Sequence, residues 1–342
     1  MQAAVLLEPG RIEVQRCPVP EPGPDDVLVR VAAVGVCGSD AHYYREGRIG
    51  DHVVTAPIVL GHEASGVVAA VGAGVSPDRV GERVSIEPQR PDWSTEESRR
   101  GLYNLCPHMA FYATPPIDGA LCDYVTIGSS FAHPVRDTIS DDDAALFEPL
   151  SVAIAAVRKA AVTGGSHVLV TGAGPVGLLT AQVARAFGAT EVVVSDVAEG
   201  RRARATEFGA TRVLDPTAED VTTLRVDALI DASGAPSAIG SGIRAVAPAG
   251  RVVLVGLGHP EISLPVSVIQ EHELVLTGVF RYANTWPTAL ELVSSGLVDL
   301  GALVTAHFGL DQVAEALDHD RDPNAVKAVV TLTPTATPLE QP

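Results

Sequence analysis

One segment near the middle of this chain constrains its fold more than any other. Val168-Leu169-Val170 resembles a buried strand, and it leads into the turn Gly172-Ala173-Gly174-Pro175-Val176-Gly177 and then into an apolar, helix-like run. In a G-x-G-x-x-G turn, the first glycine permits the tight turn and the second lets a pyrophosphate approach the backbone. The third lets the helix pack closely on the strand. Because the helix N-terminus presents free N–H groups to phosphates, the segment predicts a dinucleotide site.

An acid placed farther along the chain supports this prediction. Asp196 lies 24 residues after the first glycine, at the end of the next predicted strand. A carboxylate there would accept hydrogen bonds from the adenosine ribose and repel a 2′-phosphate, which favours NAD over NADP. The alternative role is a helix N-cap before Glu199. Arg201 lies either near the ribose or in solvent. Residues 231–234 and 255–258 (Val255-Gly256-Leu257-Gly258) end strands at the same sheet edge.

From about Ser151 onward, short apolar strands alternate with helix-like segments. Strands are predicted at 167–171, 191–195, 212–214, 226–231, 251–255 and 274–277, and helices at 178–187, 199–208 and 237–246. Strands that alternate with crossover helices are typical of a doubly wound parallel sheet in an α/β protein.

The first 150 residues have a different pattern. Short alternating runs at 26–34, 66–71, 83–86 and 121–127, separated by Gly and Pro, predict a β-rich domain. Four prolines between residues 18 and 24 predict an extended connector. Residues 89–100 are polar and predict an exposed lobe. After Phe280 we expect a helix at 286–294 and a return of the chain to the first domain, which would make that domain discontinuous.

Composition excludes several function classes. The net charge of −18 argues against binding to nucleic acid or anionic membranes. Four scattered cysteines do not form a disulfide framework, and the N-terminus lacks a basic signal-peptide region, so we expect a cytoplasmic protein. Residues 160–184 carry no charge, but their five glycines and one proline argue against a membrane span.

A second signature involves metal-binding residue types. Cys37 precedes Gly61-His62-Glu63, and together they offer sulfur, nitrogen and oxygen ligands. Three protein ligands with one open position are the pattern of a catalytic zinc. Each residue alone has a simpler explanation, since a single cysteine is usually a small core hydrophobe and a His-Glu pair is usually structural. Glu148 is an isolated acid in an apolar stretch, where it either serves a metal or its water or acts as a helix N-terminal acid.

Together these residues resemble the zinc-dependent medium-chain dehydrogenases, and in particular the sorbitol/xylitol (polyol) branch. The resemblance covers nearly the whole chain. Its characteristic stretches are Gly35-Val36-Cys37-Gly38-Ser39-Asp40-Ala41-His42-Tyr43, Gly61-His62-Glu63-Ala64-Ser65-Gly66, Tyr103-Asn104-Leu105-Cys106-Pro107, Ala113-Thr114-Pro115-Pro116-Ile117-Asp118-Gly119, Glu148-Pro149-Leu150-Ser151-Val152 and Phe280-Arg281-Tyr282-Ala283-Asn284-Thr285-Trp286-Pro287. Many relatives that act on simple alcohols have a cysteine in place of Glu148.

The resemblance implies a fold and a set of site residues. The fold would be a Rossmann doubly wound parallel sheet domain over residues 151–282 and a discontinuous, β-rich, GroES-like catalytic domain over 1–150 and 283–342. Cys37, His62 and Glu63 would bind catalytic zinc, and Glu148 would be a fourth ligand or would hold the metal's water. Ser39 or Glu148 would relay a proton. The implied substrate positions are Tyr43, Phe111, Thr114, Glu148, Arg281 and Tyr282. The implied NAD positions beyond the glycine turn are Val176, Asp196, Arg201, Val255, Leu257, Val279, Phe280 and Arg281.

One departure from the family pattern concerns a second metal. Many relatives carry a structural zinc with ligand spacing C-x2-C-x2-C-x7-C. Here the corresponding positions are Asp92, Thr95, Ser98 and Cys106. Because one cysteine cannot form a tetrahedral thiolate site, we expect no structural zinc.

The predicted activity is reversible, zinc- and NAD-dependent oxidation of a secondary hydroxyl of a sugar alcohol to a ketose. Alternatives within the fold are a sugar acid, threonine or a simple alcohol as substrate. A zinc-free, non-enzymatic NAD(P)-binding protein is a more distant alternative, and the four metal-site residues argue against it. The resemblance also implies a homo-oligomer, with a tetramer ahead of a dimer.

Overall fold

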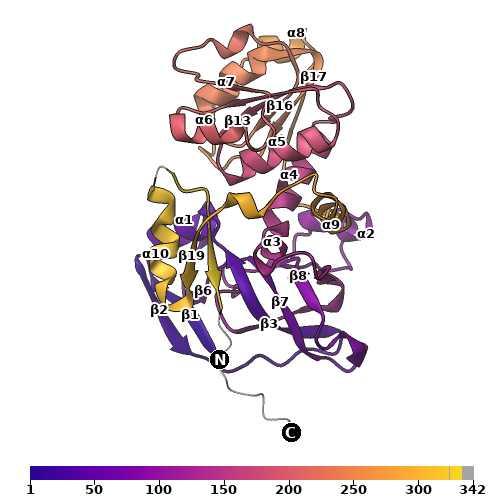
Figure 1. Cartoon of the computed structure of the whole chain (residues 1–342), viewed down its shortest axis with the longest axis vertical. Coiled ribbons are helices and arrows are strands. Elements are labelled where there is room, and N and C mark those ends of the chain that lie inside the picture. Colours follow the sequence, from indigo (N-terminus) through magenta and orange to yellow (C-terminus); the bar gives the residue numbers. More distant parts are fainter. Residues whose placement is uncertain (323, 333–342) are drawn as a thin grey trace.

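The computed structural model describes residues 1–322 and 324–332, and its two largest sheets lie one above the other in Figure 1. The upper sheet has six strands in the order β15 (Arg212–Leu214), β14 (Glu191–Ser195), β13 (His167–Thr171), β16 (Val226–Asp231), β17 (Val246–Leu254) and β18 (Val275–Gly278). All neighbours pair in parallel. The order reverses at β13, which is the hallmark of a doubly wound sheet.

Helices cover both faces of this sheet. They are α5 (Pro175–Ala186), α6 (Glu199–Ala205), α7 (Pro236–Ala245) and α8 (Val266–Glu271). Val168 and Val170 of β13 belong to one buried core together with Leu178 of α5. Leu169, which points to the other face, belongs to a second core with Ile239 of α7. Burial on both faces explains why the strands are nearly all β-branched or aliphatic.

The lower part of the molecule is built around a seven-stranded sheet. Its order is β12 (Ala132–Pro134), β8 (Arg83–Ile86), β7 (Glu63–Val71), β3 (Asp26–Gly35), β20 (Lys327–Thr331) and β19 (Val304–Gly309), with β11 (Tyr124–Gly128) also paired to β3. Smaller sheets are formed by β1 (Gln2–Glu8), β2 (Arg11–Arg16) and β6 (Ile58–Val59), by β4 (Arg48–Ile49) and β5 (His52–Val53), and by β9 (Gln89–Arg90) and β10 (Ala110–Phe111).

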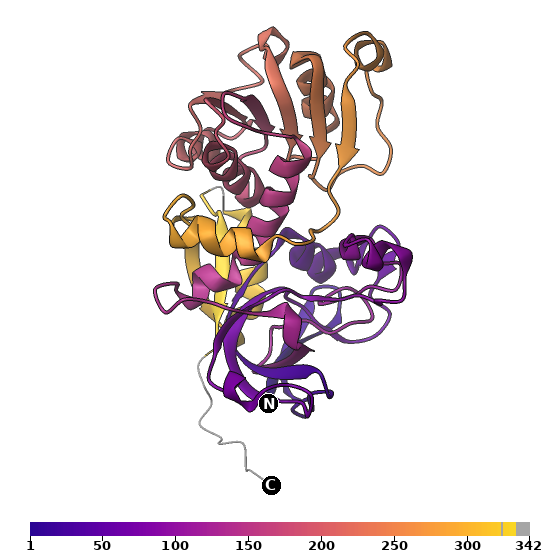
Figure 2. The ribbon, with the colours of Figure 1, turned by 90° about the vertical axis from the view of Figure 1, so that its right-hand side faces the viewer.

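Strands from the two ends of the chain meet in this lower sheet. β20 is antiparallel to β3 and pairs Val329 with Gly35. The remaining helices are α1 (Gly38–Glu46), α2 (Glu96–Arg99), α3 (Asp141–Ala145), α4 (Phe147–Lys159), α9 (Trp286–Ser294) and α10 (Val313–Asp318). α4 links the lower part to the upper one, and the chain returns from β18 to α9 (Figure 2).

Most element predictions agree with the structure. Four of the six upper strands and the helix at 286–294 have the predicted bounds, and residues 17–23 form no regular structure. β17 begins five residues earlier than predicted because its pairing with β16 shifts register between Val226 and Ala228. α5 begins at Pro175, a residue that suits the first helical position.

One expectation about exposure is wrong. Residues 89–100 were expected to be exposed, but Gln89 is fully buried. Its amide group donates hydrogen bonds to Glu87 and to the carbonyl of Tyr282, so its polar atoms are used inside the protein. Ser98 is also buried, whereas Trp93 is exposed. Within the described residues, no helix is long and apolar enough to span a membrane.

Candidate active site

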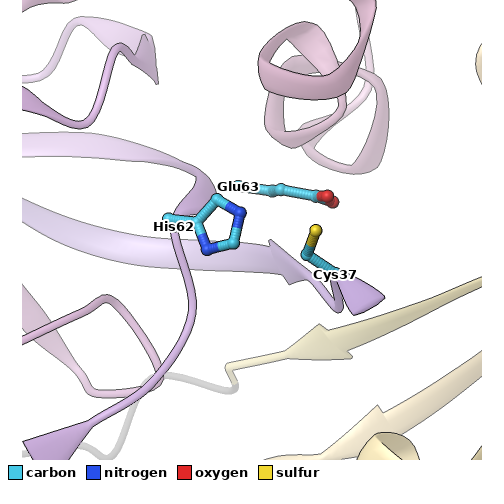
Figure 3. Close-up of side chains that lie close together, drawn as sticks. All are labelled: Cys37, His62 and Glu63. Atoms are coloured by element: carbon cyan, nitrogen blue, oxygen red, sulfur yellow. The ribbon is translucent and has the colours of Figure 1, made fainter. Parts of the chain in front are cut away.

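Two neighbouring strands bring the predicted metal ligands together. β3 ends at Gly35 and β7 begins at Glu63, and these two residues are paired. Cys37 therefore lies beside His62 and Glu63, as Figure 3 shows. Their ligand atoms all lie within 4.8 Å of one another. Glycine at position 35 leaves room for the Glu63 carboxylate, since a Cβ there would lie 2.1 Å from Oε2 of Glu63.

Glu63 has a partner that the sequence did not reveal. The ammonium of Lys327, from β20, donates to both Glu63 carboxylate oxygens at 2.7 and 2.8 Å and to the carbonyl of Val36 at 2.9 Å. Both side chains are buried. Burial alone would lower the pKa of Lys327, but the charges of Glu63 and Cys37 and the hydrogen bond to Glu63 together outweigh it, and the pKa is raised. The two groups therefore form a buried ion pair.

His62 is oriented by a second buried acid. Oδ1 of Asp40 lies 3.5 Å from Nδ1 of His62 and accepts a hydrogen bond from the Gly61 amide. Oδ2 accepts from the Cys37 amide. Burial works against ionisation of Asp40, yet His62 and the two amides keep its pKa below the ordinary value. An acid on one imidazole nitrogen leaves the other free to bind a metal, which is the usual arrangement around zinc-binding histidines.

Glu148 lies next to this cluster, on the first turn of α4. It is buried, and its Oε1 accepts a hydrogen bond of 2.8 Å from the hydroxyl of Tyr282. Burial, with a further contribution from the charge of Glu63, raises the pKa of Glu148 to about 7. It is not among the three residues whose ligand atoms gather within 4.8 Å. Near neutral pH, Glu148 can therefore both take up and release a proton.

Several predicted substrate residues surround this cluster. The ring of Phe111 lies 5.7 Å from that of His62. The guanidinium of Arg281 lies over Phe111 at 4.1 Å and over Phe280 at 4.7 Å. Tyr43 is buried, and burial raises the pKa of its hydroxyl. Ser39 and Thr114 are half-buried, and the described structure shows no side-chain hydrogen bond from either.

The glycine turn has the geometry that its sequence predicts. A Cβ at Gly177 would lie 1.8 Å from the Gly172 carbonyl, so helix and turn are in close contact. A Cβ at Gly174 would meet nothing within 4 Å, so the backbone is open where a phosphate would approach. Gly172 has a φ of +93°, a conformation that favours glycine. Pro175 begins the helix, and Val176 is half-buried.

Asp196 lies beside this turn. Its two carboxylate oxygens accept hydrogen bonds from the amides of Ala173 and Ala198, each at 2.8 Å. The N-cap residue of α6 is Ala198, so Asp196 is not itself the cap. Each oxygen keeps a lone pair for a ribose hydroxyl. Arg202 donates a hydrogen bond to the backbone carbonyl of Asp196, and the neighbouring Arg201 is half-buried.

Residues at the ends of β17 and β18 border the same sheet edge. The amides of Val255 and Gly256 donate to the Asp231 carbonyl, and a Cβ at Gly256 would lie 2.2 Å from the Gly234 nitrogen. Leu257 and Phe280 are exposed, and Val279 is half-buried. Exposed apolar side chains at the carboxyl ends of parallel strands suit a cofactor that lies across that edge.

The four positions that correspond to the structural zinc ligands of the family pattern also lie together. The Asp92 amide donates to Sγ of Cys106 at 3.3 Å, and the Thr95 hydroxyl donates to Oγ of Ser98 at 2.9 Å. His108 contacts the carboxylate of Asp92 at 3.0 Å. We call Asp92, Thr95, Ser98 and Cys106 the lobe cluster. Hydrogen bonds join its members where the family pattern has metal–thiolate bonds.

Three buried polar residues were missed by the sequence argument: Asp40, Lys327 and Glu87. Each left a weak signal. Asp40 lies three residues after Cys37, Lys327 is one of only two lysines, and Glu87 follows an apolar strand. None of these signals says which partner the side chain contacts.

Comparisons with known proteins agree with this geometry. Family models match residues 23–137 as an alcohol dehydrogenase GroES-like domain and residues 175–295 as a zinc-binding dehydrogenase. Sorbitol dehydrogenase of Gallus gallus is 40% identical over 97% of each chain. Sorbitol dehydrogenase of Homo sapiens is 42% identical over 92% of this chain and 91% of its own.

Solved structures give the same result. An Escherichia coli oxidoreductase/dehydrogenase of unknown specificity has a TM-score of 0.93 and 32% identity, covering 97% of this chain and 99% of its own. A structure described as a zinc-binding dehydrogenase from Sinorhizobium meliloti 1021, bound to NADP, has a TM-score of 0.90 and 29% identity, covering 96% and 98%. The chain therefore belongs to the zinc-dependent medium-chain dehydrogenases and is an enzyme of their polyol dehydrogenase branch.

Proposed function

We propose that this enzyme oxidises a secondary hydroxyl of a sorbitol- or xylitol-type sugar alcohol to a ketose, with NAD as the hydride acceptor. The observation that carries the proposal is the position of Arg281 and of the Tyr282–Glu148 pair beside Cys37, His62 and Glu63. A polyol has several hydroxyls to bind, and these side chains offer donors and acceptors beyond the metal ligands.

The donor set fits zinc. Thiolate, imidazole and carboxylate are all zinc ligands, and ligand atoms on a tetrahedral zinc lie roughly 3.3–3.8 Å apart. The ligand atoms of this cluster lie within 4.8 Å of one another, which is close to that spacing. Cys37, His62 and Glu63 would hold one zinc, with Glu148 as a fourth ligand or as the residue that orients the metal's water. We propose one zinc per chain, because the lobe cluster offers one thiol.

Bound zinc supplies a Lewis acid that lowers the pKa of a hydroxyl, and the nicotinamide supplies the hydride acceptor. The residues of the chain do the rest. Glu148, whose pKa is raised to about 7 by burial, receives the hydroxyl proton directly or through water, and Ser39 is the second candidate for this relay. Arg281 donates hydrogen bonds to distal hydroxyls. Tyr43, Phe111, Thr114 and Tyr282 shape the pocket.

We propose NAD as the cofactor because a carboxylate at position 196 repels a 2′-phosphate. Gly172, Gly174, Pro175, Val176, Gly177, Asp196, Arg201, Val255, Gly256, Leu257, Val279, Phe280 and Arg281 form the proposed cofactor site. The NADP-bound relative makes the choice of cofactor a necessary measurement. A comparison of kcat/KM with NAD and NADP, in wild type and Asp196→Ala, tests it: NADP use should rise in the variant.

We also propose that residues 1–150 and 283–342 form the catalytic domain and 151–282 the cofactor domain, in a cytoplasmic homotetramer. Sheet membership supports the division, although residues 333–342 lie outside the described structure. Self-association is supported by β18, which ends its sheet and exposes Val275 and Leu276 by 45% and 37%. An apolar edge strand is a natural pairing surface. Light scattering of the purified protein measures the assembly.

A panel of polyols, sugar acids, threonine and ethanol, assayed for NADH formation before and after chelation, tests the function. Polyol oxidation that chelation abolishes supports the proposal. Arg281→Ala should raise KM for polyols far more than for small monohydric alcohols. An equal loss on both substrates would remove the proposed role of Arg281.

One observation favours a sugar acid as a second candidate. Among the described residues, Arg281 has no carboxylate within ion-pair distance, and burial lowers its pKa. A substrate carboxylate would supply the missing countercharge. A higher kcat/KM on sugar acids than on polyols in the same panel would favour this candidate.

A further inference from the structure

Residues 279–285, here called the crossing segment, lead from β18 to α9 and carry Arg281 and Tyr282. The segment contains no regular structure, and Arg281 and Asn284 have φ values of +56° and +57°. Such conformations are unfavourable for residues other than glycine and persist only where surrounding contacts fix them. The contacts that fix this segment therefore control how Arg281 and Tyr282 face the substrate.

Some of those contacts lie at the surface: the Asn104 side chain donates to the Phe280 carbonyl, and Arg158 donates to the Asn284 carbonyl. Two others lead to Glu87, a buried acid outside the proposed active site. Its Oε1 accepts hydrogen bonds from the Tyr103 hydroxyl at 2.8 Å and from the side-chain amide of Gln89 at 3.1 Å. Its Oε2 lies 2.9 Å from Nε2 of His133. The three partners belong to different stretches of the chain, and they share this one carboxylate.

Two of these partners also hold the crossing segment. The backbone N–H of Asn284 donates to the Tyr103 hydroxyl at 2.7 Å. The same side-chain amide of Gln89 also donates to the backbone carbonyl of Tyr282 at 3.1 Å. The backbone that directly follows the Tyr282 side chain, at the Tyr282 carbonyl and at the Asn284 N–H, is thus tied to Glu87 through one intermediate. The Tyr282 hydroxyl in turn reaches Glu148 at 2.8 Å.

Packing does not hold this side of the segment. A cavity of about 270 Å³ lies there, and its walls include Glu87, Tyr103, His133, Asn284 and Thr285. Because the cavity leaves the segment without tight packing on that side, the hydrogen bonds to Tyr103 and Gln89 are its contacts there. Tyr103 is well placed for this role, since its hydroxyl donates to Glu87 and accepts from Asn284 at once.

We propose that Glu87, acting through Tyr103 and Gln89, is a positioning residue that sets the placement of Arg281 and Tyr282 for polyol binding. The inference rests on the proposed function, since the position of these two side chains matters only if they face a polyol. A displacement of about 1 Å at a reacting site can reduce the rate by up to a hundredfold.

The main variant is Tyr103→Phe, which keeps the ring and removes only the hydroxyl that links Asn284 to Glu87. Tyr112→Phe is the matched control, because Tyr112 is about as buried and its hydroxyl donates to the Thr126 carbonyl, away from the crossing segment. Glu87→Gln keeps the side-chain shape and one acceptor oxygen. The zinc-loaded enzymes are compared by amide hydrogen exchange at Asn284 and by kcat and KM for sorbitol, xylitol and propan-2-ol.

In Tyr103→Phe we expect at least tenfold faster exchange at Asn284 and about tenfold lower kcat/KM for the better polyol, mostly through KM. The value for propan-2-ol, which does not reach Arg281, should fall less than threefold. For Glu87→Gln, both the exchange rate at Asn284 and kcat/KM for the polyol should lie between the values of wild type and Tyr103→Phe. Tyr112→Phe should match wild type in both.

Unchanged exchange at Asn284, or an equal loss for both kinds of substrate, overturns the proposal. If wild type oxidises none of the polyols, the proposed function fails by itself. The exchange comparison needs no substrate and still decides whether Glu87 holds the segment.

Discussion

Two regions of this enzyme correspond to metal sites of its family. One of them keeps its metal-binding residue types, and the other has lost most of them. The cluster of Cys37, His62 and Glu63 keeps three kinds of zinc ligand, and buried charges on Asp40 and Lys327 support it. The lobe cluster keeps one thiol, and its remaining positions carry a carboxylate and two hydroxyls. The residues of each cluster lie close together, but buried charged pairs support the first cluster and hydrogen bonds link the second.

The difference shows what each site needs. In the lobe cluster, donors and acceptors of the side chains and backbone bond one another and link the ends of the loop. In the active site, Cys37 and His62 lie beside a carboxylate whose countercharge is a lysine. That cluster is stable as a buried ion pair, and it still presents ligand atoms. Hydrogen bonds can therefore hold a loop together where relatives use metal ligands, whereas a catalytic metal site needs ligand atoms that the protein does not fully use itself.

The largest expected effect comes from removing a ligand. His62→Ala should abolish stoichiometric zinc binding and lower polyol kcat/KM by on the order of 10³-fold, since Lewis-acid stabilisation is worth several kcal/mol. Metal analysis and steady-state kinetics measure both. His42→Ala, at an exposed position on α1, is the control. One zinc per chain in His62→Ala would contradict the ligand assignment.

The next effect concerns the buried ion pair. Lys327→Met leaves Glu63 buried and unpaired, so the free energy of unfolding of the chelator-treated protein should fall by about 3 kcal/mol. Added zinc should recover part of the loss, because the metal supplies the missing positive charge. Urea denaturation measures this.

Two comparison variants complete that test. Lys159→Met removes the only other lysine, which is exposed, and should change little. The double variant Lys327→Met/Glu63→Gln should be more stable than Lys327→Met alone. Equal stability of Lys327→Met and wild type would show that the pair contributes nothing.

A smaller effect is expected from the acid behind His62. Asp40→Asn should weaken zinc binding between tenfold and a hundredfold, since the residue that orients a metal-binding histidine typically contributes that much. Competition with a chromophoric chelator gives the affinity. Asp78→Asn, on the surface, should leave it unchanged. An unchanged affinity in Asp40→Asn would mean that His62 is oriented by its packing against Phe111.

Substitutions in the lobe cluster should have the smallest effect on activity. They also give the sharpest test of the comparison between the two metal-site regions. Asp92→Cys/Thr95→Cys/Ser98→Cys should raise the zinc content from one to two per chain, because three of the four side-chain positions already lie within hydrogen-bond distance of a neighbour. Activity should stay within twofold. Cys106→Ser in that background should return the content to one. Two zincs in the unmodified enzyme would disprove the proposed stoichiometry.

Much of the fold was predictable because local patterns determine it. The β-branched strands and the glycine turn identified the parallel sheet, and Gly61-His62-Glu63 with Cys37 identified the ligand cluster. The partners of those ligands were not predictable. Lys327 lies 264 positions from Glu63, and it reaches Glu63 only because β20 pairs with β3. No local periodicity predicts that pairing.

The polar interior was also hard to predict. Glu87 and Gln89 have the composition of a surface loop, yet both are buried where they bond Tyr103 and the crossing segment. Sequence patterns separate polar from apolar residues, and they fail where polar groups satisfy one another inside the protein.

The origin of Lys327 in the last described strand also has a consequence for biosynthesis. A ribosome adds about 5–20 residues per second, so roughly 13–53 seconds separate the synthesis of Glu63 from that of Lys327, 264 positions later. During that interval the nascent chain contains Cys37, His62 and Glu63 without the lysine and without the strand that closes the sheet beside β3. The active site is therefore completed by a segment that is translated long after the three ligands, and a chain truncated before β20 lacks the countercharge of Glu63.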